Sequence, residues 1–550
     1  MPETLTQNRI LKLDRRDNLI IALTDLRIGE EVNLGNETYT IVTDIPAKHK
    51  FALKDFAPEE HIIMYGVVVG KATQPIRKGE LITTRNIRHE AAEFHQKSES
   101  YSWHAPDVSA WKKRTFHGYK RVDGQVGTRN YWLVVPLVFC ENRNIDVLRK
   151  AFDEGLGYAP PQVYRQQVAA LARLYREGRL DAIKTYQQSS EDSRQQPHGF
   201  FENIDGVKFL THERGCGGTR EDARNLCGLI AGYLHHPNVA GATVLSLGCQ
   251  HSQADILREE IAKRDPDFAK PLILLEHQKS ASERAMLSQA IRETFLGLVE
   301  VNRVQREPAS LDKLSVGLKC GGSDGFSGLT ANPLVGRMAD RAIAAGGSAI
   351  LSEIPEVFGA ERLLMARARD EAVFDAVVEV VNDFKRYFLA HGESVSENPS
   401  PGNIAGGITT LEEKSLGAVQ KAGHGPLEDV LRYGERVRRR GLTLLEAPGN
   451  DAVSSTALAA AGATVILFTT GRGTPLGFPV PTVKIASNSD LAQRKGRWID
   501  FDAGEVLRAG FDPVADALVR KIVAIASGEE TASERNGERE IAIWKRGVTL

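Results

Sequence analysis

Several features that define common protein classes are missing from the sequence. Lys and Arg (70 residues) balance Asp and Glu (71 residues), so the net charge of -1 argues against a nucleic-acid-binding protein, which needs clustered positive charge. No run approaches the ~20 apolar residues of a membrane-spanning helix. The polar N-terminus, MPETLTQNRI, has no apolar signal core. We therefore expect a cytoplasmic protein that binds neither nucleic acid nor a membrane.

Cysteine is scarce, with 5 residues in 550, and the odd number suits a reducing compartment better than a disulfide framework. The metal signatures CxxC and HExxH are absent, and so are the P-loop and the dinucleotide fingerprint GxGxxG. The nearest string, GRGTPLG at 471–477, has one residue too many and places Pro475 where a helix should begin. These absences disfavour an NAD-dependent enzyme.

The residues that are present indicate a globular protein of about three domains. Apolar residues make up 42% and charged residues 26%, and glycine is plentiful, with 50 residues. Residues 1–92 contain short runs rich in β-branched residues and separated by turns, which predicts a small all-β domain. Residues 93–115 are polar and aperiodic, which is typical of a linker.

From residue 116 onward, apolar runs alternate with helical patterns, which predicts an α/β fold with a mostly parallel sheet. The run Tyr131–Val138 has the continuous apolar character of a buried strand, and Pro136 predicts that this strand ends early or lies at a sheet edge. Residues 151–200 are polar, with a helical pattern over 161–178, and are interpreted as an insertion without chemistry of its own.

Residues capable of chemistry follow several of the predicted strands, and ligands bind at such strand ends in parallel sheets. One loop contains His212 and Cys216 and leads into a helix whose Thr219–Asp222 spacing resembles a capping box. The other residues at strand ends are Cys249, His251, Cys320, Asp324, Glu353, Glu356 and Arg472. Glycine beside three of these cysteines suits close approach of the backbone to a bound group.

The three glycine-flanked cysteines allow two interpretations. Thiolates from Cys216, Cys249 and Cys320 can hold an iron–sulfur cluster with one open iron. Alternatively, Cys, His and a carboxylate can bind one divalent metal ion. Spacing alone does not decide between these centres. Cys227 lies on the apolar face of a predicted helix and is expected in the core, whereas Cys140 suits a core role and a site role equally.

Several strings together resemble the altronate/galactarate dehydratase family. They are GYKRVDGQVGTRNY at 118–131, THERGCG at 211–217, LGCQHSQ at 247–253, CGGSDGFSGLTANP at 320–333, SEIPEVFGAE at 352–361 and FTTGRG at 468–473. The resemblance covers residues 116–550, and part of residues 49–79 is similar to the small β-clip (SAF-type) domain of the family. It implies a β-clip domain at 1–92, an α/β middle domain at 116–255 that forms a homodimer, and a Rossmann-like catalytic domain at 256–550.

The resemblance also implies an activity, that of a hydro-lyase which dehydrates a small sugar acid and depends on Fe(II) or Mn(II). Because the closing WKRGVTL is more similar to the altronate branch, the implied reaction converts D-altronate to 2-dehydro-3-deoxy-D-gluconate within galacturonate catabolism. Galactarate dehydration and a sulfolactate-type sulfo-lyase remain alternatives within the family. A non-catalytic sugar-acid-binding protein is the alternative from another class.

One segment departs from the family pattern. The β-clip domain of the family usually ends in His-x-His-Asn, whereas this chain has Thr83-Thr84-Arg85-Asn86 there, with His89 just beyond. Arg85 and His89 must therefore substitute for the family histidines, or the role of those histidines is lost.

Dehydration of a 2,3-dihydroxy acid needs a base for the C2 proton, assistance for the departing C3 hydroxyl, and positive charge near the enediolate. Each role has candidates in this sequence. The metal candidates are Cys216, Cys249, Cys320 and His212, and His212 is also a candidate base. The other catalytic candidates are Glu353, Asp324 and His49, the last as a lid residue from the β-clip domain. The substrate-binding candidates are Arg472, Lys484, Arg129, Ser323 and Asn332.

Overall fold

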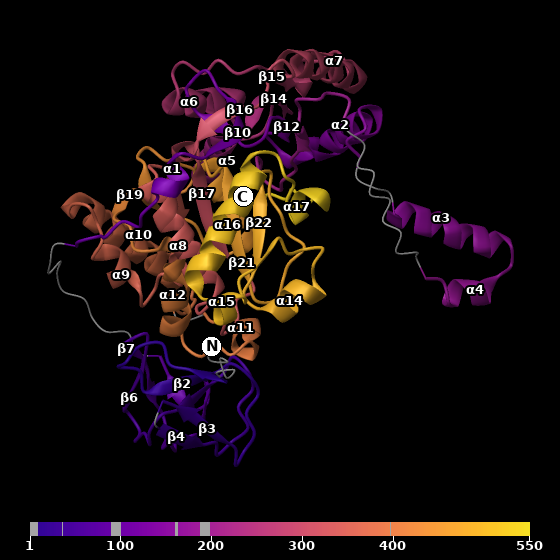
Figure 1. Ribbon diagram of the computed structural model, residues 1–550. Coiled ribbons are helices and arrows are strands. Elements are labelled where there is room, and N and C mark those ends of the chain that lie inside the picture. The colour runs from indigo at the N-terminus through magenta and orange to yellow at the C-terminus, as the bar shows by residue number, and fades with distance from the viewer. Residues whose placement is uncertain are drawn as a thin grey trace.

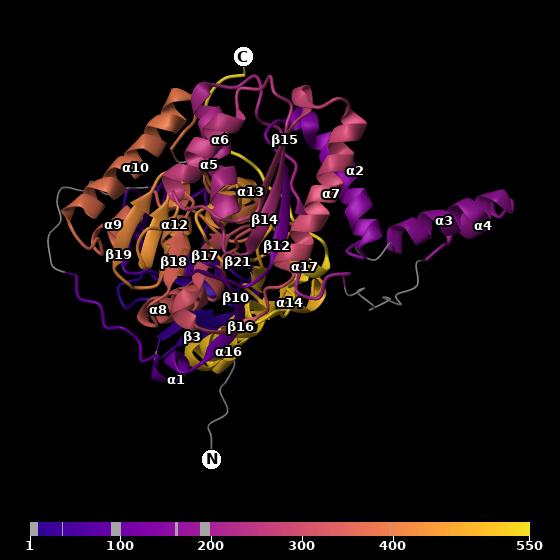
Figure 2. The ribbon, with the colours of Figure 1, turned by 90° about the horizontal axis from the view of Figure 1, so that it is seen from above.

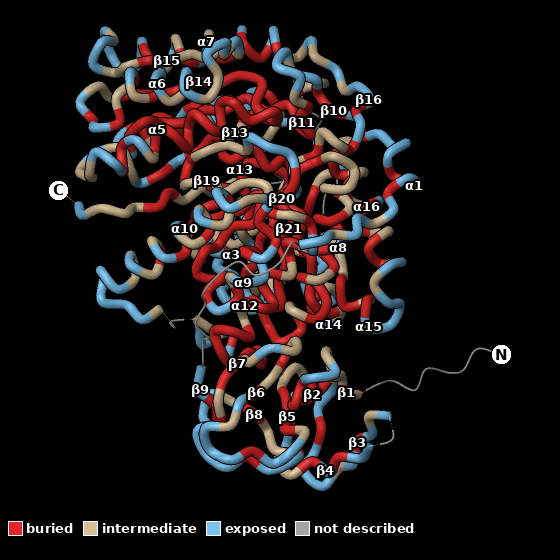
Figure 3. Tube along the Cα trace, turned by 90° about the vertical axis from the view of Figure 1, so that its left-hand side faces the viewer, coloured by how far each residue is buried: buried red, intermediate tan, exposed pale blue. Residues whose placement is uncertain are grey.

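The computed structural model describes residues 9–35, 37–89, 101–159, 163–187, 199–395 and 398–549. Figure 1 shows a small β domain below an α/β body, and the body contains two separate parallel sheets. Buried residues follow the strands and inner helix faces of this body (Figure 3). The predicted all-β N-terminal domain and α/β remainder are thus confirmed. Within the described residues, no helix combines the length and apolar character needed to cross a membrane.

The N-terminal domain consists of short antiparallel strands. One sheet has the order β1 (Ile10–Leu11), β2 (Leu19–Ala22), β5 (Lys50–Ala52) and β8 (Leu81–Ile82). The others contain β3 (Glu31–Leu34) with β4 (Glu37–Thr40), and β6 (His61–Met64), β7 (Val67–Ala72) and β9 (Ile87–Arg88). Between β6 and β7, Tyr65 and Gly66 have positive φ angles of 57° and 72° and reverse the chain, so one apolar run forms two strands.

The middle domain is built on a four-stranded parallel sheet. Its order is β13 (Gly206–Phe209), β12 (Tyr131–Pro136), β14 (Val239–Ser246) and β15 (Leu272–Glu276). β12 ends at Pro136 as predicted, but it lies between two strands instead of at an edge. Because β15 pairs with β14, this domain extends beyond residue 255, where the sequence analysis placed its boundary.

Helices cover both faces of the middle sheet because β12 is apolar on both sides. Trp132 and Val134 pack in one cluster with α2 (Asn142–Gly155) and α7 (Glu283–Val301). Leu133 and Val135 face α5 (Arg220–His235) and α6 (Ala254–Arg264) in another cluster. The capping box predicted at Thr219–Asp222 is present at the start of α5.

The predicted insertion forms an arm. Its helices α3 (Val163–Arg176) and α4 (Leu180–Lys184) project away from the body in Figures 1 and 2. The helix expected over 161–178 is therefore confirmed as α3. Residues 93–100 of the predicted linker and residues 160–162 and 188–198 of the insertion lie outside the described residues. The remainder of the linker contains only the short helix α1 (Ser109–Lys112).

The C-terminal domain contains a seven-stranded parallel sheet. Its order is β19 (Leu427–Leu431), β20 (Gly441–Leu445), β18 (Ser348–Leu351), β17 (Ser315–Cys320), β21 (Val465–Thr470), β22 (Thr482–Ala486) and β23 (Phe501–Asp502). Its helices include α8 (Ala331–Ala344), α10 (Glu371–Ala390), α12 (Leu411–Val419), α13 (Asp451–Ala460) and α16 (Phe511–Ala526). The chain leaves β17 toward β18 on one side and later returns to β21 on the other. This reversal of direction is where ligand sites form in such sheets.

Many contacts join the middle and C-terminal domains, and two of them show how. β10 (Thr115–Lys120) pairs with β16 (Glu307–Ser310). Arg129 is buried and donates to both carboxylate oxygens of Glu534, at 2.7 and 2.9 Å, and to three backbone carbonyls. Its guanidinium is fully occupied by the protein, so the substrate-binding role expected for Arg129 does not fit and we assign it a structural role.

This buried pair generates a stability prediction. Arg129→Met removes the partner of a buried carboxylate, and we expect the free energy of unfolding to fall by about 3–5 kcal/mol. The matched control is Lys120→Met, which breaks the exposed pair with Glu307 and should cost less than about 1 kcal/mol. Chemical denaturation of both variants measures the difference, and similar small losses in the two would contradict the assignment.

Candidate functional site

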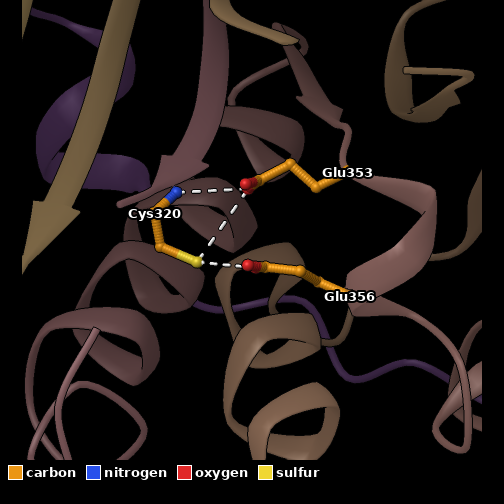
Figure 4. A group of neighbouring side chains, drawn as sticks. All are labelled: Cys320, Glu353 and Glu356. Atoms are coloured by element: carbon orange, nitrogen blue, oxygen red, sulfur yellow. Dashed lines mark hydrogen bonds between the residues drawn. The ribbon is translucent and has the colours of Figure 1, made fainter. Parts of the chain in front are cut away.

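A buried thiol and two buried carboxylates meet at the ends of two neighbouring strands. Cys320 ends β17, and Glu353 and Glu356 follow β18. The Cys320 thiol lies 2.9 Å from Glu356 Oε2 and 3.9 Å from Glu353 Oε2, and the Cys320 N–H donates to Glu353 at 3.2 Å (Figure 4). Two of the predicted site residues, Cys320 and Glu353, are therefore in contact.

The backbone at Glu353 is strained. Its φ angle is +71°, a left-handed conformation that costs a residue other than glycine about 1–3 kcal/mol. Glu353 follows β18 after one residue, Ser352, and begins the turn of Ile354–Glu356 that brings both carboxylates to the same thiol. Such strain persists only where the surrounding contacts determine the conformation.

Three lysines neutralise this cluster. Lys319 donates to Glu353 and, at 2.8 Å, to Asp451. Lys421 lies 2.7 Å from the Cys320 sulfur and 3.0 Å from Glu353, and Lys414 lies 3.1 Å from Glu356. Three ammonium groups thus face three carboxylates, and sequence reasoning identified none of these lysines.

Burial and charge move the pKa values of this cluster in different directions. Burial, together with the neighbouring Glu356, raises the pKa of Glu353. Burial also raises the pKa of the Cys320 thiol, to about 12, so Cys320 is protonated at neutral pH. Burial opposes ionisation of Glu356 as well, but Lys414, Lys421 and Lys319 outweigh it and lower the pKa of that carboxyl to about 2.

The cluster does not fit the divalent metal that the sequence analysis expected. Among the described residues, Cys320, Glu353 and Glu356 form the one group of three potential metal ligands close enough to share an ion. Each carboxylate oxygen is already paired with a lysine or an N–H, however, and Lys421 lies against the sulfur. A divalent cation would add to three ammonium charges in a buried, low-dielectric region, where unpaired charge is strongly disfavoured.

The solvent-facing rim of the cluster contains Asp451 and Arg472. The Asp451 side chain is 35% exposed and contacts Lys319 from the N-terminus of α13. Arg472 is exposed, and no ion pair joins it to an acidic side chain of the described residues. Gly321 and Gly322 separate the two: a Cβ on Gly321 would lie 2.5 Å from an Asp451 oxygen, and one on Gly322 would lie 3.5 Å from the Arg472 Cβ. The rim therefore presents a free cation beside a lysine-bound carboxylate.

Asp324 lies beside Gly471, the residue before Arg472, at the point where the N-terminal domain docks. It accepts a hydrogen bond from Lys48 at 2.7 Å and others from Ser327 and Ser487. Ser323, Asp324 and Asn332 line a cavity of about 20 Å3, which has room for about one water molecule and none for a sugar acid. In this conformation these three residues do not form a substrate site.

Around His49, the N-terminal domain reaches the C-terminal domain through the two neighbouring lysines and not through His49 itself. Lys48 binds Asp324, and the buried Lys50 binds Glu413. His49, between them, contacts the carbonyl of Ala47 within its own loop at 3.2 Å. A lid role for His49 gains no support from this arrangement.

The segment that departs from the family pattern makes one contact across domains. His89 Nδ1 lies 2.6 Å from Glu412, a buried residue at the start of α12. Arg85 is exposed and makes only backbone hydrogen bonds among the contacts described. His89 therefore reaches the C-terminal domain, whereas Arg85 does not.

His212 and Lys484 are occupied by structural contacts. His212 Nε2 donates to the Pro136 carbonyl at 2.7 Å, and Nδ1 accepts from the Arg214 N–H at 3.1 Å. Burial lowers the pKa of His212 to about 4, so the ring is neutral with both nitrogens used. Lys484 is buried against Glu538 at 2.6 Å and the Thr474 carbonyl. These contacts argue against His212 as a ligand or base and against Lys484 as a carboxylate partner.

The expected grouping of three thiols is corrected by the structure. Cys320 is buried in the C-terminal domain, whereas Cys216 and Cys249 are exposed on the middle domain. The group of potential ligands around Cys320 contains neither of them. The error arose because a strand-end position does not reveal which of two sheets the strand joins. Cys227 is buried in α5 as predicted, and burial raises the pKa of its thiol to about 12.

Comparison with known proteins assigns all three domains. Family models match residues 8–90 (altronate/galactarate dehydratase SAF domain), 118–302 (D-galactarate dehydratase/altronate hydrolase, second domain) and 311–549 (D-galactarate/altronate dehydratase, C-terminal). Altronate dehydratase of Escherichia coli (strain K12) is 40% identical over 98% of this chain and 99% of that protein. Altronate dehydratase of Bacillus subtilis (strain 168) is 39% identical over 98% and 99%. Galactarate dehydratase (L-threo-forming) of Escherichia coli is 30% identical over 97% and 96%.

These matches span the whole body and the N-terminal domain in the order in which the structure arranges them. They define a hydro-lyase that dehydrates a sugar acid. The chain belongs to the altronate/galactarate dehydratase family, as the resemblance in its sequence predicted.

Proposed function

We propose that the substrate is D-altronate, which the enzyme converts to 2-dehydro-3-deoxy-D-gluconate and water. The two altronate dehydratases at 40% and 39% identity support this choice over galactarate, whose dehydratase is 30% identical. A sulfolactate sulfo-lyase subunit beta from Chromohalobacter salexigens is 28% identical over 79% of the chain, which makes that substrate class the least supported of the three.

The observation that carries the mechanism is Lys319, which lies between the partly exposed Asp451 and the buried Glu353, with the free Arg472 on the same rim. Arg472 pairs with the substrate carboxylate, because guanidinium groups bind carboxylates in a bidentate manner. The ammonium of Lys319 adds the second positive charge that an enediolate needs. Glu353 acts as a positioning residue that keeps Lys319 charged and directed toward Asp451.

Each proton in this mechanism has a donor and an acceptor. Asp451 removes the C2 proton, and the electron pair forms the enediolate on the carboxylate held by Arg472. The C3–O bond then breaks, and the hydroxide leaves as water with the proton that Asp451 took from C2. Lys319 stays charged throughout, because its buried ammonium is held by Asp451 at 2.8 Å, by Glu353 and by the Cys320 carbonyl. The enol takes a proton from water at C3 and gives the proton of its C2 hydroxyl to the resulting hydroxide, which yields the 2-keto acid.

We also propose a Rossmann-like identity for the C-terminal domain. If β17, β18, β20, β21, β22 and β23 are numbered along the chain, their order in the sheet is 3-2-1-4-5-6, with β19 added at one edge. This is the order of the doubly wound dinucleotide fold. Here the reversal between β17 and β21 holds Gly321, Gly322 and Arg472 in place of a nucleotide fingerprint.

The homodimer implied by the sequence resemblance remains our proposal for the assembly. α7 of the middle domain exposes Ile291, Phe295, Leu296 and Val299, and the nearby Phe200 is 66% exposed. Burial of this apolar face against a second copy would remove it from water.

The substrate assignment is tested with a panel of purified acids. We expect kcat/KM for D-altronate to exceed the values for galactarate and for sulfolactate by at least about tenfold, the ratio that a difference of about 1.4 kcal/mol in transition-state binding produces. The product is identified by mass and by its reaction with a keto-acid reagent. A higher value for galactarate would refute the assignment, and binding of all acids without turnover would indicate a sugar-acid-binding protein.

The role of Asp451 is tested by Asp451→Asn. Loss of the base should lower kcat by about 10²–10⁴-fold, the usual contribution of a general base, while the fold is preserved. Asp490→Asn is the matched control, because Asp490 also lies in the first turn of a short helix and pairs with a basic side chain, Arg494. Equal activity of the two variants would remove Asp451 from the mechanism.

The role of Arg472 is tested by Arg472→Met. Loss of a charged hydrogen bond of about 1.5–3 kcal/mol predicts a fall in kcat/KM of roughly 10–150-fold, expressed mainly as a higher KM. Arg494→Met, which breaks an exposed pair in the same domain, should leave both constants near their original values. If Arg472→Met leaves KM unchanged, the substrate carboxylate binds elsewhere.

A further inference from the structure

Three exposed thiols lie at one edge of the middle sheet, and the proposed reaction uses none of them. Cys140 follows β12, Cys216 follows β13 and Cys249 follows β14. These three strands are neighbours in the order β13-β12-β14 and are parallel, so the loops that contain the thiols emerge at the same edge. The other two cysteines of the chain, Cys227 and Cys320, are buried.

Hydrogen bonds hold the three loops together close to the thiols. The Phe139 N–H donates to the Arg214 carbonyl at 2.9 Å, and the His251 N–H donates to the Gly215 carbonyl at 3.0 Å. The loop after β13 is therefore bonded to the loop after β12 on one side and to the loop after β14 on the other. Each bond involves residues within two positions of a cysteine, so the three thiols belong to one connected set of loops.

Glycines make this arrangement possible. Gly215 and Gly217 flank Cys216 with φ angles of +106° and +65°, and Gly248 precedes Cys249 with +112°. A Cβ on Gly215 would lie 2.3 Å from the Leu137 carbonyl oxygen, so only glycine allows the loops after β12 and β13 to approach this closely. The excess of glycine at these strand ends brings backbones together while the thiols stay exposed.

The type of ligand follows from the three donors and their separation. Thiolates are soft ligands that select iron–sulfur clusters, zinc or copper(I). A single ion requires its ligand atoms close to one another, and among the described residues the one such group is Cys320, Glu353 and Glu356. A four-iron cluster binds each thiolate through a different iron, so its cysteine sulfurs lie further apart than those of a single-ion site.

The charge around the thiols suits an anionic cluster. α5 begins at Arg220, directly after the loop of Cys216, and the N-terminus of this sixteen-residue helix carries partial positive charge. A cavity of about 90 Å3 beside Cys216 is lined by Arg214, Lys545 and His251, and also by Glu213 and by Asp222, which belongs to the capping box of α5. Arg214 and Lys545 supply positive charge at the same edge of the sheet.

We propose that Cys140, Cys216 and Cys249 bind a [4Fe–4S] cluster in the middle domain, with one iron free of protein thiolate. The proposal replaces Cys320 of the predicted set with Cys140. It places the iron in the middle domain and not in the lysine-neutralised cluster of the C-terminal domain. The proposal does not depend on which sugar acid is the substrate.

The test uses the full chain, expressed with added iron and purified without oxygen. We expect about four iron and four acid-labile sulfide per chain, and broad visible absorbance that air destroys. Cys140→Ser, Cys216→Ser and Cys249→Ser should each lose most of the iron and sulfide. Cys320→Ser is the matched control and should retain both. Circular dichroism verifies that each variant is folded.

A second measurement needs no variant. In the anaerobic protein, the cluster should protect Cys140, Cys216 and Cys249 from alkylation by iodoacetamide, and removal of iron by a chelator and an oxidant should expose all three together. Mass spectrometry of peptides locates the label. This labelling therefore reports on each thiol separately in the chain without any substitution.

Several outcomes would overturn the proposal. The first is a colourless protein with one zinc or one iron per chain and no sulfide. The second is that Cys140→Ser retains iron while Cys320→Ser loses it. The third is equal labelling of the three thiols before and after iron removal. Iron, sulfide and labelling are measured without substrate. A failed substrate assignment therefore leaves them unchanged, and a missing cluster leaves the relative preference for D-altronate to be measured separately.

Discussion

The balance of charge inside the C-terminal domain is the constraint on which the rest of the site depends. Lys319, Lys421 and the carboxylates of Glu353 and Glu356 are almost fully removed from water, where each alone would be strongly disfavoured. They persist because every charge has a partner within hydrogen-bond distance or close to it. This balance leaves the Cys320 thiol protonated and opposes the binding of a cation in the cluster. The charged groups that reach solvent, Asp451 and Arg472, lie on the rim of the cluster.

Ion pairs between lysine or arginine and a carboxylate also join the domains. Lys50 of the N-terminal domain is buried against Glu413 of the C-terminal domain, Lys48 reaches Asp324, and Arg129 of the middle domain is buried against Glu534. Each pair places a cation of one domain in an anionic position of another. Removing one partner of a buried ion pair leaves an uncompensated buried charge, which costs more free energy than replacing both partners. Such pairs therefore favour the arrangement of domains in which both partners meet. These ion pairs add to the apolar cluster that all three domains share.

The sequence predicted the architecture better than the site. Continuous apolar runs identified β12, β13, β14, β17 and β21, because a strand that is buried on both faces is apolar at nearly every position. The motif strings identified the family, and Cys320 and Glu353 were found at strand ends. The lysines were missed because Lys is interpreted as a surface residue by default, and its partners lie far away in sequence: Lys421 contacts a thiol 101 positions earlier. Lys484 and Arg129 were misassigned for the same reason, since their carboxylate partners lie 54 and 405 positions further along the chain.

The arm formed by α3 and α4 leaves the body after α2 and returns before β13, two elements of the same domain. Neither parallel sheet contains a strand from this arm. No residue of α3 or α4 belongs to the apolar clusters that pack on the sheets, whereas Leu156, Phe201 and Ile204 at the base of the arm pack against the middle sheet. This segment is a natural position for a label, an affinity tag or a tether to a surface, at a distance from the Lys319 cluster and from the edge that bears Cys140, Cys216 and Cys249.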